Sequence, residues 1–217
     1  MVRYDFPKYE IILDLEEDIY FPAEDTFALI DAIQLEDNHR FVIEIGSGSG
    51  IISIVLAKSN PKVRFLITDI SLPAVKNIKK NIEINEIRNT IDLVCMDKLE
   101  ASINLYPDVV IWNPPYLPMG DETENIKALD KVMVIGGNKG FEEAFKLMQY
   151  LKSLNINVIL YTIFSSIGTS ESVFNTIRET EGIEVIVCSE VNLFFEKLYL
   201  VKVIIGEING KKIKTES

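Results

Sequence analysis

The chain has 217 residues, of which 47% are hydrophobic and 25% are charged, so it carries enough apolar side chains to bury one continuous core. Its formal net charge of -11 argues against a protein that grips duplex nucleic acid, because that binding needs a basic surface to displace counterions from phosphates. The N-terminus lacks the pattern of a cleaved signal, and no apolar run approaches membrane-spanning length. We therefore expect a cytoplasmic protein without a membrane segment.

Cysteine and histidine usage argues against metal chemistry. Cys95 and Cys188 lie in apolar, strand-like runs, where buried free thiols are expected in a reducing compartment. His39 is the single histidine and lies in a polar stretch, which predicts a surface position. Without a cluster of Cys and His residues, we expect no metal site.

Short runs rich in Val and Ile alternate with helical patterns, as in a parallel sheet covered by helices. The expected strands are 41–46, 63–69, 91–96, 108–112, 156–162, 183–189 and 197–205. The expected helices are 49–59, 72–87, 139–153 and 170–180. This alternation predicts the α/β class and a Rossmann-like, doubly wound, seven-stranded sheet with helices on both faces. We expect the usual strand order 3-2-1-4-5-7-6, with the last strand antiparallel.

The ends of the chain depart from this alternation. Residues 1–20 are expected to form an N-terminal arm, as a short strand or an extended segment. Residues 21–206 are expected to form one domain. The polar residues 207–217 predict a tail that frays.

A glycine-rich turn follows the first expected strand and opens a helix. The run Glu44 to Gly50 contains Gly46, Gly48 and Gly50, and glycines allow positive φ and a close approach of the backbone to a ligand. Many nucleotide sites share this feature, and a tight strand-to-helix turn needs glycine in any case. The turn alone therefore does not identify the ligand.

Two acids follow the next strands at the same expected edge of the sheet. Asp69 stands 23 residues beyond Gly46, where a carboxylate can accept both hydroxyl hydrogens of a ribose. Asp97 follows the third strand and is a candidate acceptor for the exocyclic amine of adenine, with a helix cap or turn as the alternative. Ligands of doubly wound sheets bind beyond the carboxyl ends of the strands, so these residues indicate an adenosine site.

The tetrapeptide Asn113-Pro114-Pro115-Tyr116 follows the fourth expected strand. Two prolines fix the backbone and lack N–H groups, so that carbonyl acceptors face the cleft. The Asn113 side-chain oxygen and the Pro114 carbonyl can each take one hydrogen of a planar NH2 group, while the Tyr116 ring faces a flat substrate. The pattern predicts a clamp for an amide or aromatic amine nitrogen.

Together, the clamp and the adenosine site indicate methyl transfer from S-adenosylmethionine. The methyl group of that sulfonium is already activated, so the protein has to align it with the nitrogen, and such positioning is worth up to roughly 7–11 kcal/mol. A histidine base is not required.

The chain resembles the release-factor glutamine methyltransferases, and more closely their short archaeal and eukaryotic branch. The resemblance covers about residues 20 to 145 and rests on four stretches. These are Pro22 to Thr26, Glu44 to Gly50, Asn113 to Tyr116, and Gly136 to Gly140. It implies methylation of the glutamine in the Gly-Gly-Gln motif of a class I release factor, with Gly136 to Gly140 either near the mouth of the site or simply the entry turn of a helix.

The resemblance also implies site residues and a partner. Cofactor contacts are implied for Thr26, Glu44, Gly46, Asp69, Asp97 and Asn113, and Asn113 with Pro114 is implied to hold the substrate glutamine. Members of this branch often work with a small zinc-ribbon activator protein. Residues 91–96 are expected to be an exposed edge strand, which invites a partner strand.

Three other functions compete with this interpretation. An adenine-N6 or guanine-N2 methyltransferase acting on RNA or DNA would use the same clamp, although a recognition module and a basic channel are missing from the sequence. A cofactor-binding scaffold without transfer activity would not need an intact clamp. A dehydrogenase would need an acid/base group beside the nicotinamide, and none is evident.

Overall fold

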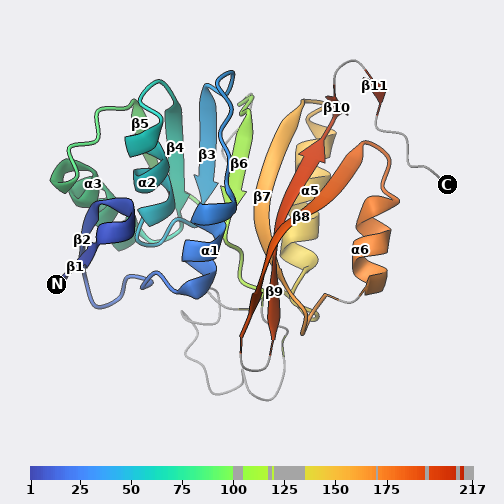
Figure 1. Ribbon diagram of the computed structural model, residues 1–217, viewed down its shortest axis with the longest axis horizontal. Coiled ribbons are helices and arrows are strands. Elements are labelled where there is room, and N and C mark those ends of the chain that lie inside the picture. Colours follow the sequence, from blue (N-terminus) through green and yellow to red (C-terminus); the bar gives the residue numbers. More distant parts are fainter. Residues whose placement is uncertain are drawn as a thin grey trace. The chain divides into compact units, whose positions relative to one another are not determined.

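The computed structural model describes residues 1–99, 105–116, 119, 135–169, 171–193, 196–208 and 211–212. The chain divides into two units, Met1–Trp112 and Asn113–Ser217, which Figure 1 shows in the colours of the sequence. Among the described residues, no helix is long and apolar enough to cross a membrane.

Four parallel strands form the sheet of the first unit. In spatial order they are β5 (Ile91–Cys95), β4 (Arg64–Asp69), β3 (Phe41–Ile45) and β6 (Val109–Trp112). Helix α1 (Glu24–Ala32) precedes β3, while α2 (Ile51–Ser59) and α3 (Leu72–Ile84) connect successive parallel strands. Every residue of β6 is buried, as expected for a strand covered on both faces, and this explains its unbroken apolar sequence.

The second unit contributes three antiparallel strands, with β9 (Lys197–Ile205) between β7 (Val158–Ser165) and β8 (Ile183–Asn192). Helix α5 (Glu142–Ser153) contacts β7 and β9, and α6 (Glu171–Arg178) contacts β8. The whole sheet has the order β5-β4-β3-β6-β7-β9-β8. This confirms the predicted fold class, the strand order 3-2-1-4-5-7-6 and the antiparallel last strand.

Residues 1–15 form a hairpin that the sequence pattern did not specify. Strand β1 (Val2–Phe6) pairs with β2 (Ile11–Leu15) across the short 3-10 turn η1 (Pro7–Tyr9). The hairpin is a separate two-stranded sheet, and β2 lies against helix α3. In the C-terminal tail, β10 (Glu207–Ile208) pairs with β11 (Lys211–Lys212), while residues 209–210 and 213–217 of the predicted fraying segment lie outside the described residues.

A ladder of asparagines on α3 and just beyond its end holds the hairpin in place. Asn81 Oδ1 accepts the Asp14 N–H at 2.9 Å, and Asn77 Nδ2 donates to the Asp14 carbonyl at 2.9 Å. Asn85 accepts the Ile12 N–H and donates to the Ile12 carbonyl. Residues four apart share one helix face, so these amides replace a partner strand for the edge of β2.

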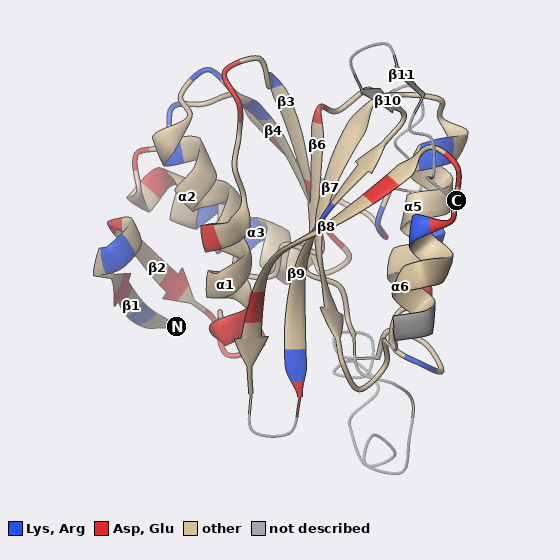
Figure 2. Ribbon diagram, turned by 45° about the vertical axis from the view of Figure 1, so that its right-hand side comes forward, with Lys and Arg blue, Asp and Glu red and all other residues tan. Residues whose placement is uncertain are grey.

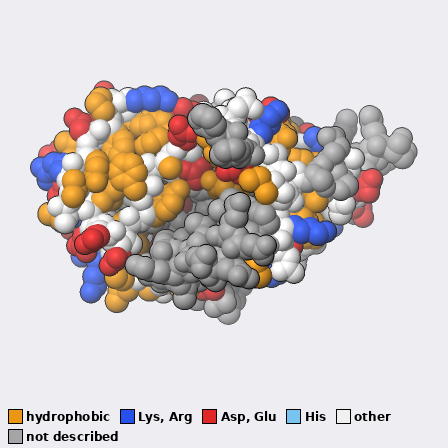
Figure 3. Space-filling model, turned by 90° about the horizontal axis from the view of Figure 1, so that it is seen from below, with side chains coloured by type: hydrophobic (Ala, Val, Ile, Leu, Met, Phe, Trp, Pro, Cys, Tyr) orange, Lys and Arg blue, Asp and Glu red, His pale blue; other side chains and the backbone are white. Residues whose placement is uncertain are grey.

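Aromatic rings cover the junction of the hairpin with α1. Tyr4 meets Phe21 edge-on at 4.8 Å between centroids, and Phe27 lies between Phe6 and Tyr9 at 5.6 and 5.9 Å. Phe21 nevertheless remains 48% exposed. Seen from below, hydrophobic side chains gather on the surface of the first unit (Figure 3).

Three expectations about burial are wrong. Cys95 and Cys188 are free thiols, as expected, but both are exposed, because each belongs to a strand at an edge of the sheet, where fewer neighbours cover it. His39 is buried because its turn folds back on itself. The His39 N–H donates to the Glu36 carbonyl, and its Nδ1 accepts the Glu36 N–H at 3.0 Å.

The asparagine ladder predicts a graded loss of stability. Asn81→Ala leaves the buried Asp14 N–H without its acceptor, which costs about 2 kcal/mol of unfolding free energy. Asn85→Ala, whose bonds to Ile12 are exposed, is the matched control and is expected to cost less than about 1 kcal/mol. Urea denaturation of both variants measures the difference, and equal losses would contradict this account of the docking.

Candidate active site

The glycine-rich turn joins β3 to α2 in the first unit. Gly46, Gly48 and Gly50 have φ values of 58°, 54° and 76°, a left-handed conformation that side chains rarely adopt. Gly50 is also confined by packing, because a Cβ there would lie 2.9 Å from two carbons of Ile78. The turn therefore requires glycine for its backbone conformation and, at Gly50, also for space.

Asp69, the last residue of β4, fixes this turn. Its Oδ2 accepts the Gly48 N–H at 2.8 Å and its Oδ1 accepts the Ser71 N–H at 2.8 Å. The residue is 8% exposed. An ionised carboxylate has about four acceptor sites, so both oxygens retain capacity for further donors such as hydroxyl groups.

Glu44 lies beneath the turn and is 1% exposed. Its Oε2 accepts the N–H of Ser53, in the first turn of α2, at 3.0 Å. Burial raises the pKa of Glu44 to about 7, and the nearby Asp69 charge raises it further while hydrogen bonds from Ser53 lower it. Glu44 therefore supports the N-terminus of α2 from inside the fold. The resemblance implied a cofactor contact at Glu44, and the sequence analysis did not anticipate this structural role.

The start of α1 lies against the outer side of the glycine turn. Thr26 is buried and donates its N–H and its hydroxyl to Asp25 Oδ1 at 2.7 and 3.2 Å. The Tyr20 hydroxyl donates to the same carboxylate at 3.3 Å, and the Tyr20 Cβ lies 3.2 Å from the position of a Cβ on Gly48. Burial, with the Asp25 charge, raises the pKa of Tyr20 to about 12.

Tyr20 is a residue of this region that the sequence analysis missed. Its place immediately before the Phe21-Pro22-Ala23-Glu24-Asp25 stretch was the available signal. Asp97 follows β5 and stands next to Met96, whose N–H donates to the Asp69 carbonyl. The Asp97 side chain is 43% exposed and 3.8 Å from Lys98 Nζ.

Strand register determines where the Asn113-Pro114-Pro115-Tyr116 motif begins. Ile45 of β3 pairs with Trp112 of β6, so the next residue along each parallel strand is Gly46 in one case and Asn113 in the other. The Trp112 ring nitrogen lies 3.6 Å from the position of a Cβ on Gly46. The chain therefore leaves β6 at the same edge of the sheet at which the glycine turn begins.

The proline motif opens the second unit and contacts the Gly136–Gly140 loop. Asn113, Pro115 and Tyr116 are half-buried and Pro114 is buried. A Cβ on Gly136 would lie 2.2 Å from the Pro115 carbonyl oxygen. Two of the four stretches that carry the resemblance, Asn113 to Tyr116 and Gly136 to Gly140, are thus in backbone contact.

The fold and the residues at the carboxyl edge of the sheet define a class I methyltransferase. A family model described as "Methyltransferase small domain" matches residues 24–135. The chain is 31% identical over 195 residues to a putative protein N5-glutamine methyltransferase of Methanocaldococcus jannaschii, covering 88% of this chain and 94% of that protein. The chain belongs to the methyltransferase small domain family and is an S-adenosylmethionine-dependent methyltransferase.

The chain is also similar to a second curated relative and to a solved structure. The eRF1 methyltransferase catalytic subunit mtq2 of Schizosaccharomyces pombe is 32% identical over 158 residues, with 64% of this chain and 68% of that protein covered. The solved hMettl16 catalytic domain in complex with a MAT2A 3'UTR hairpin has a TM-score of 0.65 at 15% identity, with coverage of 95% and 78%. At that identity the structural likeness shows the fold alone.

The described residues fit the cofactor. Asp69 offers a carboxylate with spare acceptor capacity, and the glycine turn beside it leaves no side chain between backbone and ligand. Among the described residues, no three His, Cys, Asp or Glu side chains gather as metal ligands.

The buried Glu44 predicts a pH-dependent stability. Its folded pKa of about 7 lies above the ordinary value of 4.5, so the folded protein binds more protons than the unfolded chain between these pH values. Stability from this group is present below pH 4.5 and is lost as the pH rises through 7. Glu44→Gln keeps an acceptor for Ser53 and removes the charge. We expect the variant to gain on the order of 2–3 kcal/mol relative to the wild type between pH 5 and pH 8.

Urea unfolding of both proteins at one-unit steps of pH measures this relative gain. Parallel pH profiles for wild type and variant would show that Glu44 does not titrate in this range.

Proposed function

We propose that the chain methylates the side-chain amide nitrogen of the glutamine in the Gly-Gly-Gln motif of a class I peptide chain release factor. The observation that carries the proposal is the start of Asn113-Pro114-Pro115-Tyr116 directly after β6, at the sheet edge where the glycine turn begins. The printed names of the Methanocaldococcus and Schizosaccharomyces relatives support a protein glutamine as the acceptor.

The acceptor motif suits a weak nucleophile. The lone pair of an amide nitrogen is delocalised, so the nitrogen has to be oriented rather than deprotonated by a strong base. Asn113 Oδ1 is shielded from solvent, and Pro114 lies in a segment where two successive residues have no N–H. Asn113 Oδ1 and the Pro114 carbonyl oxygen each accept one hydrogen of the substrate NH2 group. The ring of Tyr116 lies against the plane of that group.

The proposed cofactor site assigns one task to each residue. Asp69 accepts the ribose hydroxyls, Asp97 accepts the adenine amine, and Thr26 lies with Gly46, Gly48 and Gly50 around the remainder of the cofactor. Glu44 supports the turn from below. When bound, S-adenosylmethionine supplies an activated methyl group. No histidine is needed, and the single histidine, His39, precedes β3 and thus lies at the amino end of the strand.

Charge favours a protein substrate over RNA or DNA, the second candidate. Residues 1–32, which hold the hairpin and α1, contain nine acidic and two basic residues, and Figure 2 marks acidic residues in red on these elements. A phosphate backbone would be repelled by this segment of the first unit. A cofactor-binding scaffold without activity is disfavoured because the acceptor motif is complete.

A methyl-transfer assay separates the candidates. Tritiated S-adenosylmethionine is supplied with a release factor, with its Gly-Gly-Gln→Gly-Gly-Ala variant, and with RNA and DNA. We expect label on the intact factor alone. Transfer to RNA or DNA but not to the factor would contradict this proposal and favour an adenine-N6 or guanine-N2 methyltransferase.

Asn113→Ala separates binding from transfer. Loss of one acceptor leaves the amide hydrogens unequally held, so we expect kcat to fall about 100-fold or more. Calorimetric affinity for S-adenosylhomocysteine is expected to stay within about threefold, and Asn138→Ala, an exposed residue of the neighbouring loop, is the control. Unchanged turnover would remove Asn113 from its assigned role.

We also propose that a small zinc-ribbon activator pairs with β5. This strand is an edge of the sheet, and the name "catalytic subunit" of the Schizosaccharomyces relative supports a second subunit. The Met96 N–H bonds the Asp69 carbonyl and the Thr90 carbonyl accepts the Phe65 N–H. Since alternate residues of a parallel strand face the same neighbour, the intervening Leu93 N–H points to the open edge.

Leu93→Pro removes that N–H without breaking the bonds to β4. We expect the variant to lose co-purification with the activator, whereas Leu93→Ala, which keeps the N–H, retains it. Equal binding by both variants would place the partner elsewhere.

A further inference from the structure

Two glycines in the second unit are not explained by backbone conformation. Among the described glycines, seven have positive φ, while Gly136 and Gly168 do not. A residue with a side chain could adopt their backbone angles, so another property must require glycine. At both positions that property is a close approach of another backbone segment.

Gly168 lies in the turn after β7 and touches the Gly136–Gly140 loop. A Cβ at this position would lie 1.8 Å from the Lys139 carbonyl oxygen and 2.9 Å from its carbon. The turn itself is fixed to the end of β7, because Ser165 accepts the N–H groups of Gly168 and Thr169 at 3.2 and 2.8 Å. Ser165 is buried, so this turn is a firm support for the Lys139 carbonyl.

Gly136 carries the contact from the loop to the proline motif. A Cβ at Gly136 would lie 2.2 Å from the Pro115 carbonyl oxygen and 2.4 Å from the Gly140 carbonyl oxygen. The Met119 N–H, just beyond the motif, donates to the Gly137 carbonyl at 3.0 Å. Backbone thus lies against backbone from Pro115 to the loop, and from the loop to Gly168.

Glu142 holds the Gly136–Gly140 loop in the shape that these backbone contacts require. Its carboxylate accepts the Lys139 N–H at 2.9 and 3.1 Å and the Phe141 N–H at 3.2 Å. These bonds fix the Asn138–Lys139 and Gly140–Phe141 peptide groups. The loop therefore presents its carbonyls to both glycines as a single rigid piece.

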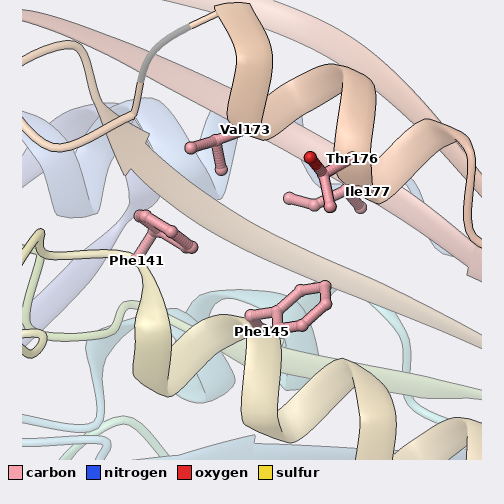
Figure 4. Close-up of a pocket in the computed structure, with 5 residues that line it drawn as sticks. All are labelled: Phe141, Phe145, Val173, Thr176 and Ile177. Atoms are coloured by element: carbon pink, nitrogen blue, oxygen red, sulfur yellow. The ribbon is translucent and has the colours of Figure 1, made fainter.

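Side-chain packing on the other side of the loop is loose. Phe141 points into an apolar pocket of about 80 Å³ between α5 and α6, together with Phe145, Val173, Thr176 and Ile177 (Figure 4). Groups that border an open pocket lose contacts on that side. The position of the loop consequently depends more on its backbone contacts with Gly168 and Pro115 than on the packing of the Phe141 side chain.

We infer that Gly168 is a positioning residue for the acceptor motif. It belongs to no motif of the sequence, yet it sets the place of the Pro115 carbonyl through Lys139, Gly140 and Gly136. Direct backbone contact contains no flexible side chain to absorb a shift, so a displacement at Gly168 is transmitted to the proline motif. The inference deepens the proposed function and rests on its assignment of the acceptor role to this motif.

Gly168→Ala tests the inference with a measurement of turnover. A shift of about 1 Å in an aligned group can cost about 100-fold in rate, so we expect kcat to fall about 10- to 100-fold. KM for the protein substrate and the affinity for S-adenosylhomocysteine are expected to change less than about threefold. Gly182→Ala is the matched control, because a Cβ there meets nothing within 4 Å although φ is 76°.

Amide hydrogen exchange of Met119 gives a readout that needs no substrate. We expect faster exchange in Gly168→Ala and Gly136→Ala than in the wild type, and no change in Gly182→Ala. Because the added methyl group in Gly168→Ala could prevent folding, Glu142→Ala loosens the loop without adding atoms. It is expected to give the same changes, and Glu142→Gln, which keeps an acceptor, is expected to restore wild-type exchange and kcat.

The outcomes separate the inference from the proposed function. If wild-type enzyme does not methylate the release factor, the proposed function fails and Met119 exchange alone decides the inference. Unchanged Met119 exchange in both Glu142→Ala and a folded Gly168→Ala overturns the inference. A fall in kcat in Gly182→Ala equal to that in Gly168→Ala also overturns it, since a general loss of stability rather than the contact with Lys139 would then be the cause.

Discussion

The carboxylate of Asp69 accepts the backbone N–H groups of Gly48 and Ser71, and the order of the first unit's site depends on this pair of bonds. They tie the end of β4 to the turn after β3. Within the turn the Gly50 N–H donates to the Ser47 carbonyl, and Asp69 supplies the acceptor for the Gly48 N–H. A charged acceptor is suited to this task because hydrogen bonds to ionised groups are the stronger ones.

Buried acids in this unit hold the backbone in place at the carboxyl edge of the sheet. Glu44 supports the first turn of α2 while its burial raises its pKa, and Asp25 collects bonds from Tyr20 and Thr26 beside the glycine turn. Transfer from an activated methyl group requires alignment more than acid–base catalysis. A site built from fixed backbone and buried carboxylates meets that requirement.

Motif and periodicity predicted the sheet well because buried parallel strands have an unmistakable apolar composition. The hairpin of residues 2–15 was not predicted, since its partner is a row of asparagine amides on α3 and beyond its end rather than a strand. The burial of His39 and the exposure of the two cysteines were predicted wrongly. Burial depends on which strands become edges and on how a turn folds, and local hydropathy does not report either.

The sequence by itself determined the methyltransferase class, the strand order and the stretches from which the site is built, because glycine turns, terminal acids and paired prolines carry their chemistry locally. Tertiary structure alone decided which of these stretches touch. Gly136 meets Pro115 and Gly168 meets Lys139 across 21 and 29 residues of chain, respectively. Such contacts form when separate loops are brought together at the ends of strands, and a glycine needed for close approach looks in sequence like any other glycine.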